Sequence, residues 1–455
     1  MALTVTYWRV CRRWLEPVFL VFILVGSTSR SDAQVIPERP VFWIPPWNAQ
    51  HVFDPTPLPL LSDPTTRVLA PEDTPVKGRQ WPEYRSPGIR SGAWMFDPAV
   101  TAGGFYDSNV FSSNTNAESD LASRLGASLH ALSLWERHGL DLQLSTLSTI
   151  YREHSGLNQT DAGLKGQGHY DIDHATSLLT AFETSYLHEA VGSLTSPANA
   201  VQPTPYSLLS GDVTLRHEFG RFTGSAGARV ASYDFGSTTA QNGTPINQDS
   251  RDGQVYTAHG RLDYAFSEKS AIFTGLEGNV RRLRGAPDQS FNSDGYRALA
   301  GLDVELTHLI KAEFAGGYMA QRFESVAVGT AQGPTYRAML TWSPSRRLDV
   351  YFNAEQIVGT FDTSLTAVLA NGVQLGFDYE LRRNLVFSTA AAWEKDRFQG
   401  QPRVDIDYVA DAQLKYLLNN IVSLSLQYRF QRRNSNESQF SFDKHLIGIN
   451  ATAQF

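Results

Sequence analysis

The chain has 455 residues, of which 42% are hydrophobic and 19% are charged, and its formal net charge is −7 at pH 7. This acidic charge argues against nucleic-acid binding, which needs clustered positive residues. The only cysteine is Cys11, so an exported mature chain would contain no disulfide and would need a large core, a closed barrel or both.

The first 33 residues have the three-part layout of a secretory signal peptide. Arginines precede an apolar run at 17–26, and the small residues Ser31 and Ala33 frame a cleavage site before Gln34. The apolar run is too short to span a bilayer as a helix, although a retained membrane anchor is the alternative interpretation. Removing residues 1–33 leaves 35 basic and 44 acidic residues, which is a net charge of −9.

Residues 34–92 differ in kind from the rest of the chain. Ten prolines lie between residues 37 and 75, and proline disfavours both strand pairing and helix interiors. We therefore predict an extended periplasmic arm or linker. Its apolar elements at 41–44 and 58–61 are candidates for docking on a partner or on the barrel, and plain disorder is the alternative.

From residue 93 to 455 the chain alternates apolar and polar residues with a period of two. The clearest segment is 404–416, in which Val404, Ile406 and Tyr408 share one face while Asp405 and Asp407 share the other. Such segments suit strands that cross a bilayer at a tilt. We predict an all-β fold, namely a transmembrane antiparallel up-and-down β-barrel of about 18 strands in the bacterial outer membrane.

Connection lengths support the barrel independently, because short turns and long loops alternate, as in outer-membrane barrels. Predicted turns include 138–139, 219–220, 267–270, 343–345, 382–384 and 419–420, and predicted long loops include 153–160, 192–205, 236–250, 285–293, 326–333 and 433–438. A soluble propeller or β-helix is the alternative fold, but the chain lacks the fixed-period repeat that these folds need.

The last alternating segment ends on the aromatic residue Phe455, which shares a face with Ile447 and Ile449. A terminal aromatic of this kind is typical of the signal that the barrel-assembly machinery reads. Outer-membrane lipid and this machinery are therefore expected partners, and a homo-oligomer is compatible with the sequence.

Short motifs occur in order at both ends of the barrel region. The first are Pro-Glu-Tyr at 82–84 and Tyr-Asp-Ser-Asn-Val-Phe at 106–111, followed by a Ser-Asp pair at 119–120, and the last is Arg-Asn-Ser-Asn at 433–436. Together they resemble the "putative β-barrel porin 2" family of outer-membrane proteins. The resemblance implies a porin-type barrel, although the cargo of the family is largely unassigned. Some members resemble components found with exopolysaccharide export.

The sequence contains no Gly-x-Ser-x-Gly elbow, His-Glu-x-x-His motif or Walker loop. The scattered histidines are not paired with a nucleophile in the sequence. His169 and His174 are five residues apart, which places them on opposite faces of a strand and argues against a metal site. We expect neither catalysis nor a cofactor.

If the apolar faces meet lipid, the opposite faces line the lumen. Basic residues then dominate the first two thirds of the barrel: Arg216, Arg229, Arg261, Arg281, Arg297 and Arg337. Acidic residues follow, with two arginines near closure: Asp349, Glu355, Asp378, Glu380, Asp405, Asp407, Asp411, Arg429 and Arg433. Opposed walls would create a transverse field that orients polar solutes. The alternative is that these charges pair across strands and fill the interior.

A barrel of about 18 strands is wide enough for an aqueous channel unless a loop or plug blocks it. The predicted function is therefore passive passage of small hydrophilic solutes. The alternative is a structural or polysaccharide-export role, with periplasmic export components docked on the arm.

Overall fold

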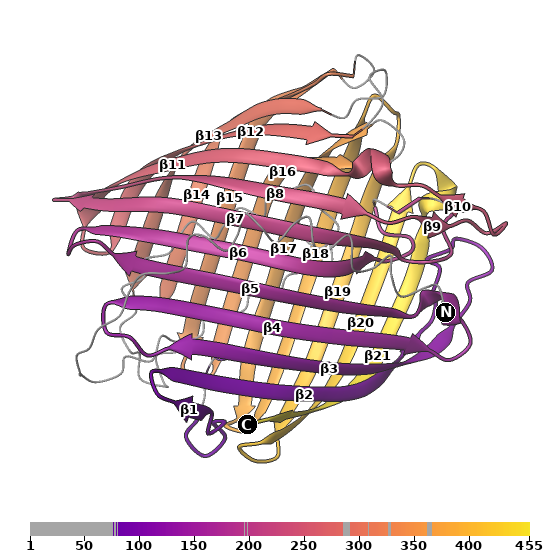
Figure 1. Ribbon diagram of the computed structural model, residues 1–455, viewed down its shortest axis with the longest axis horizontal. Coiled ribbons are helices and arrows are strands. Elements are labelled where there is room, and N and C mark those ends of the chain that lie inside the picture. Colours follow the sequence, from indigo (N-terminus) through magenta and orange to yellow (C-terminus); the bar gives the residue numbers. More distant parts are fainter. Residues whose placement is uncertain are drawn as a thin grey trace, which may run out of the picture. The chain divides into compact units, whose positions relative to one another are not determined.

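The computed structural model describes residues 76, 79 and 81–455, apart from 195, 198, 285–291, 308, 326–328 and 362–365. The predicted signal peptide and the prolines of the predicted arm lie outside these residues. Eighteen long strands form a closed antiparallel barrel, in which β21 pairs with β2 to complete the ring (Figure 1). This confirms the predicted fold and strand number. No helix among the described residues is long and apolar enough to cross a membrane.

The barrel strands follow one another around the ring in chain order. The first nine are β2 (Trp94–Asp107), β3 (Asp120–Ser133), β4 (His138–Tyr151), β5 (Gln159–Asp171), β6 (Thr176–Glu189), β7 (Thr204–Phe219), β8 (Phe222–Phe235), β11 (Gly253–Ser267) and β12 (Ser270–Leu283). The other nine are β13 (Ser293–Thr307), β14 (Ile310–Phe323), β15 (Thr330–Ser345), β16 (Leu348–Phe361), β17 (Thr366–Arg382), β18 (Leu385–Gln399), β19 (Val404–Leu417), β20 (Val422–Ser435) and β21 (Phe442–Gln454).

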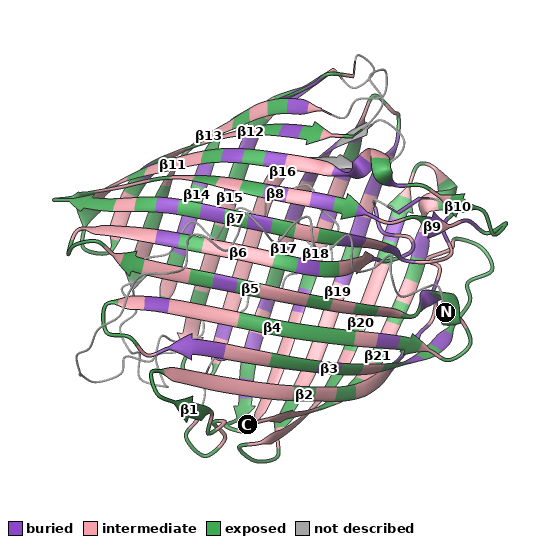
Figure 2. Ribbon diagram, in the orientation of Figure 1, coloured by how far each residue is buried: buried purple, intermediate pink, exposed green. Residues whose placement is uncertain are grey.

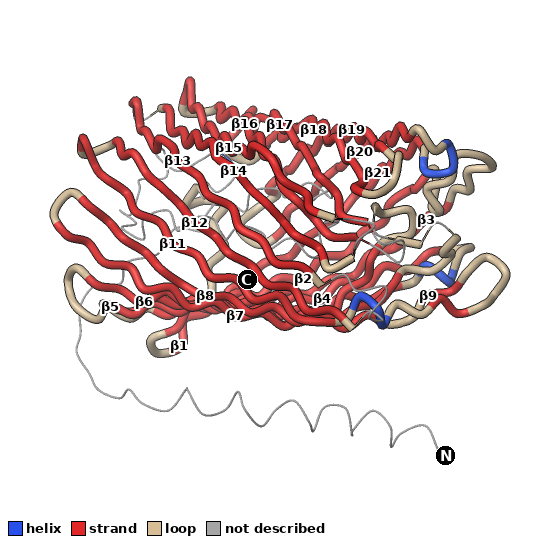
Figure 3. The backbone as a smooth tube through the Cα atoms, turned by 90° about the horizontal axis from the view of Figure 1, so that it is seen from above, coloured by secondary structure: helices blue, strands red, loops and turns tan. Residues whose placement is uncertain are grey.

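Short turns close one end of the strands and longer connections close the other (Figure 3). The long-loop end also carries the hairpin of β9 (Thr238–Thr239) with β10 (Pro245–Ile246), and single 3-10 turns that include Ser155–Leu157 and Asp249–Arg251. Before the barrel, β1 (Ile89–Ser91) pairs back on the start of β2. In outer-membrane barrels the short turns face the periplasm and the long loops face outside.

Exposed and less exposed residues alternate along the strands, as Figure 2 shows by colour. Large apolar side chains point outward, and Leu125, Leu276 and Ile449 are 60%, 60% and 59% exposed. Their outward position follows from the period of two, which puts every second side chain on the same face of a strand. This apolar outer face is what contact with lipid requires.

Two predicted turns are misplaced. His138 and Gly139 lie within β4, and the turn precedes them at 134–137. Glycine is common in turns, but Gly139 lies in a strand. The absence of a side chain there leaves room for the ring of His169 on the neighbouring strand β5. Similarly, Ser343–Ser345 belongs to β15, and the chain turns at Arg346 and Arg347.

The largest buried apolar cluster lies on the inner wall near the long-loop end. Its members are Tyr206, Ala231, Tyr233, Phe235 and Val255, from β7, β8 and β11. The cluster packs next to the long loops and supports them. Many other buried residues of the barrel are polar or charged.

Candidate functional site in the barrel lumen

All fifteen charged residues predicted for the lumen lie on barrel strands, on the face opposite the outward apolar side chains. On β12, for example, Val280 is exposed on the outside while the next residue, Arg281, is only 2% exposed. Arg261 and Glu313, on strands three positions apart, approach within 2.8 Å, as side chains on the concave face of a barrel do. The lumen therefore carries charge along much of its length.

The arginines of the first two thirds are not isolated from carboxylates. Arg261 contacts Asp263 and Glu313, each at 2.8 Å. Arg297 and Arg337 share the carboxylate of Glu355, each at 2.8 Å. Because basic strands carry acidic partners, this geometry favours the interpretation in which lumen charges pair across strands over that of two opposed walls.

The acidic residues of the last third separate into groups along the barrel. Near the long loops, Arg433 contacts Asp407 at 3.1 Å and Asp405 at 3.9 Å, and Arg403 donates to Asp405 at 3.0 Å. Halfway down, Arg429 pairs with Asp411 at 2.6 Å. Asp349, Asp378 and Glu380 lie at the short-turn end. The predicted acidic wall is therefore a set of local networks. The remaining predicted arginines also have partners: Arg216 pairs with Glu218 at 2.9 Å, and Arg229 and Arg281 each make at least one interaction.

The connection between β6 and β7 crosses the barrel at the long-loop end. Its residue Leu194 is 3% exposed and packs with Val368, Ala370 and Phe398 on β17 and β18. β6 and β17 are nine positions apart in the ring of 18 strands, so they lie on opposite walls. This connection, 190–203, is hereafter called the crossing loop. Through the contacts of Leu194 it reaches across the long-loop end of the lumen to the opposite wall.

A buried ion pair anchors the start of the crossing loop. Arg251 donates to both oxygens of Glu189, at 2.9 and 3.0 Å, and its guanidinium lies 4.0 Å from the ring centre of Phe235. Farther along, an antiparallel bridge joins Ala200 to Ala240 in the connection between β8 and β11. Two long connections are thus joined, and no pattern in the sequence predicted which of them folds inward.

The family follows from the barrel sequence. Residues 81–455 match the family model described as "Putative beta-barrel porin 2". The chain belongs to this family. The resemblance predicted from motifs at the two ends is confirmed and extends over the whole barrel. Family and apolar outer face together place the porin in the bacterial outer membrane.

The fold is also similar to solved barrels, although their sequences are distant. The siderophore receptor PirA from Acinetobacter baumannii has a TM-score of 0.44 and 7% identity, covering 78% of this chain and 80% of that chain. OpdQ from Pseudomonas aeruginosa has a TM-score of 0.43 and 10% sequence identity, and the match covers 80% of this chain and 97% of that chain. A BenF-like porin from Pseudomonas fluorescens has a TM-score of 0.43 and 12% sequence identity, and the match covers 79% of this chain and 99% of that chain. No curated protein sequence matches the chain.

At the short-turn end, the segment before β1 is docked on the barrel. The backbone N–H of Val76 donates to Asp349 at 2.5 Å, while Arg79 and Trp81 donate to Glu380 at 2.9 and 3.1 Å. Arg79 and Glu380 are both about 5% exposed or less. The end of the porin's predicted arm is thus bound to β16 and β17. Two residues that we predicted for the lumen wall serve here as its docking points.

The docked segment then runs to β1 and β2, which are separated from β17 by four strands of the ring. A second contact follows the first, because Glu83 accepts a hydrogen bond of 3.0 Å from Arg383 in the turn after β17. We call residues 76–88 the periplasmic strap. These contacts lie at the short-turn end of the barrel, opposite the crossing loop.

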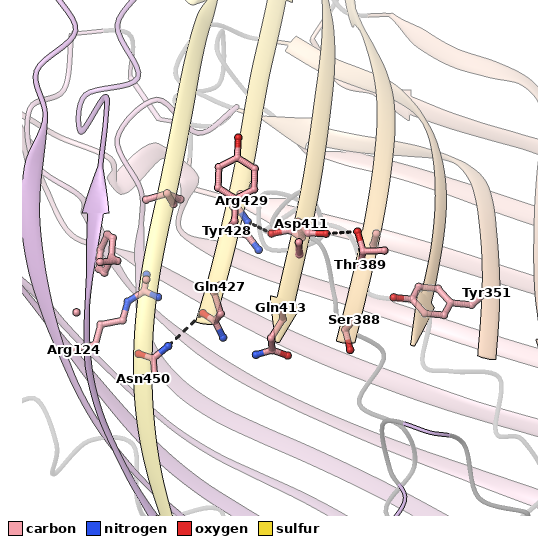
Figure 4. A pocket seen from close by; sticks show the side chains of 16 residues that line it. Arg124, Tyr351, Ser388, Thr389, Asp411, Gln413, Gln427, Tyr428, Arg429 and Asn450 are labelled. Carbon is pink, nitrogen blue, oxygen red and sulfur yellow. Dashed lines mark hydrogen bonds and ion pairs between the residues drawn. The ribbon is translucent and has the colours of Figure 1, made fainter. Parts of the chain in front are cut away.

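Between the two ends, the inner wall holds a recess of about 140 Å³. It is lined by side chains from strands far apart in the sequence, including Arg124, Tyr351, Asp411, Gln427 and Asn450 (Figure 4). The close-up shows Arg124 reaching from β3 toward the yellow strand that carries Asn450. Asn450 donates a hydrogen bond of 3.4 Å to Gln427.

Glycines give the recess its shape. A Cβ at Gly376 would lie 2.5 Å from the ring of Tyr351, so the missing side chain lets that ring lie across β17. Asn450 lies in the same way over Gly103 on β2. Among the lining residues, only Asp411 and Arg429 were predicted for the lumen from the sequence. The available signal for Arg124 was its inward position between Leu121 and Leu125.

Proposed function

We propose that the porin is an outer-membrane channel for passive passage of small hydrophilic solutes, narrowed by the crossing loop. The observation that carries this proposal is the closed ring of 18 strands with an apolar outer face and a charged, hydrogen-bonding inner face. A lumen filled only by packing would need apolar side chains, whereas ion-pair networks and a polar recess offer hydration along the path.

Lumen aromatics bear on the alternative, a polysaccharide-export role. A chain of sugars would be guided by rings with free faces, yet the rings of Phe105, Phe235 and Phe273 each lie under an arginine guanidinium, at 4.0, 4.0 and 3.6 Å. These contacts occupy the faces on which sugars would stack. The arrangement supports passage of small solutes over passage of a polymer.

Export with a cleaved signal peptide at 1–33, followed by folding through the barrel-assembly machinery, belongs to this proposal. Phe455 is 47% exposed and its backbone N–H donates to the carbonyl oxygen of Pro98 at 2.9 Å, which leaves its ring accessible at the seam. Mass spectrometry of protein purified from outer membranes tests the cleavage, with Gln34 expected as the first residue.

The decisive experiment is single-channel recording of the folded, signal-free protein in planar bilayers. We expect steady openings with modest ion selectivity, because lumen charges of both signs are paired. A folded barrel that stays silent at every voltage would overturn the channel proposal. Folding is checked separately by the heat-dependent shift in gel mobility that intact barrels show.

A further inference from the structure

The recess contains an arginine whose charge is not matched. Among the described residues, no carboxylate lies within ion-pair distance of Arg124, and its buried Nε donates no hydrogen bond. Its guanidinium instead lies 4.0 Å from the ring centre of Phe105. The lumen arginines Arg261, Arg297 and Arg337, by contrast, each contact a carboxylate.

The carboxylate that acts electrostatically on Arg124, that of Asp107, already has other partners. Asp107, on the neighbouring strand β2, forms an ion pair with Lys444 at 2.9 Å and accepts a hydrogen bond of 2.9 Å from the backbone N–H of Asn109. The other charged neighbour of Arg124 is Arg429, which has the same sign and pairs with Asp411 at 2.6 Å. Arg124 is therefore a positive group held beside a second arginine, which is the arrangement of an anion site.

An unmatched acceptor lies in the same recess. Asp411 uses Oδ1 to accept Arg429, but its buried Oδ2 accepts no hydrogen bond. Buried donors and acceptors without partners cost free energy, so native proteins rarely retain them without a reason. One molecule that brings both an anionic acceptor and a hydroxyl donor would satisfy Arg124 and Asp411 together.

The remaining lining groups suit such a molecule. The side-chain amides of Asn450, Gln427 and Gln413 and the hydroxyl group of Tyr351 surround the recess (Figure 4). Its volume of about 140 Å³ is close to that of a cavity that admits benzene, about 150 Å³, so a ligand of roughly six or more heavy atoms has room to enter.

We propose that this recess is a binding site for a small hydroxylated carboxylate. Arg124 holds the carboxylate through paired N–H donors, Asp411 accepts a ligand hydroxyl, and Asn450 orients the chain between them. The proposal deepens the channel function, since a solute reaches the site by way of the lumen. It names the class of solute that the channel would favour.

The test is calorimetric titration of the detergent-solubilised, signal-free protein with gluconate. Propionate serves as a carboxylate without hydroxyls, and glucose serves as a polyol without charge. We expect saturable binding of gluconate, and binding weaker by about tenfold or more for the other two probes. Equal affinity for gluconate and propionate would contradict the proposed role of Asp411.

Variants assign the binding to the recess. Arg124→Gln should weaken gluconate binding by about tenfold or more, and Asn450→Ala should weaken it by a smaller factor. The matched control is Arg432→Gln, which removes an arginine from the outer face of β20, where Arg432 pairs with Asp443 at 2.6 Å. Wild-type affinity in a correctly folded Arg124→Gln variant would overturn the proposal.

Conductance separates this inference from the channel function. Open channels that bind no gluconate would leave the channel standing and reject the binding site. Gluconate binding to a silent barrel would support the site and reject passive passage. In a conducting barrel that binds gluconate, the probe should also reduce the open-channel current with the same concentration dependence as in calorimetry.

Discussion

The guanidinium group of Arg433 donates a hydrogen bond of 3.1 Å to the carbonyl oxygen of Gly192, which attaches the crossing loop to β20. The two residues are 241 positions apart in the sequence. The same guanidinium contacts Asp407 at 3.1 Å, so the network that holds the loop is continuous with the charges of the wall.

Shortening the crossing loop should widen the channel. Deleting 192–198 removes Leu194 from its contacts with β17 and β18, and single-channel conductance should rise several-fold because the obstruction leaves the mouth. A deletion of equal length in the connection between β12 and β13, at 285–291, provides the comparison. Unchanged conductance in a folded deletion variant would show that the loop does not limit flow.

The anchor of the crossing loop should be sensitive to loss of one charge. Arg251→Ala leaves Glu189 buried without its cation, and breaking a buried pair in this way costs about 3–5 kcal/mol of stability. The guanidinium chloride midpoint of unfolding should fall accordingly. The double variant Arg251→Met with Glu189→Gln removes both charges and should recover much of the loss. If both variants unfold alike, the loss comes from packing against Phe235 and not from charge.

The loops at the long-loop end contain a pH-dependent contact. The hydrogen bond to Glu118, 2.9 Å long, is the main cause that raises the pKa of His154 above its usual 6.5, and Asp120 at 3.0 Å adds to it. Because the folded pKa is raised, this stabilisation is fully present below pH 6.5 and is lost as pH rises through the folded pKa.

Hydrogen exchange of residues 108–119 and 152–158 measures this effect. Exchange beyond the intrinsic pH dependence should speed up as the pH rises above 6.5, and His154→Gln should remove the excess. An identical profile in wild type and variant would mean that protonated His154 does not hold these loops together.

The periplasmic strap should detach when its docking pair is broken. Arg79→Ala removes the ion pair with Glu380 and keeps the hydrogen bond that Trp81 donates to the same carboxylate. Cleavage by trypsin after Arg85 should then become faster by about tenfold or more, because local opening exposes the segment. Arg90→Ala, at an exposed position on β1, is the control and should leave the cleavage rate unchanged.

The period-two pattern predicted the strands and the inward faces well. Residues such as Val404 and Asp405 alternate because lipid and lumen lie on opposite sides of each strand, and that constraint acts on every strand locally. The turn after β15 was misplaced because Ser343 and Ser345 resemble turn residues, while the pairing with β16 extends the strand to Ser345.

The partners of the lumen charges could not be predicted in the same way. Whether Arg297 meets Glu355 depends on the tilt and register of strands three positions apart, and both are properties of the closed ring. The crossing loop was equally hidden, since its anchor Leu194 is one apolar residue in a polar connection. The docking of Arg79 on Glu380 joins segments 301 residues apart, and no local pattern records it.

The pairing of β2 with β21 affects how the barrel can fold and assemble. Thr101 on β2 pairs with Thr452 on β21. The edge of β2 that faces away from β3 is therefore paired along most of its length only after the last strand has been added. Until then the protein is an open sheet with two unpaired edges, which readily pair with other chains. A polypeptide that stops short of Phe442 keeps both edges and cannot separate lumen from lipid. The seam thus makes completeness of the chain a condition for leaving the assembly pathway.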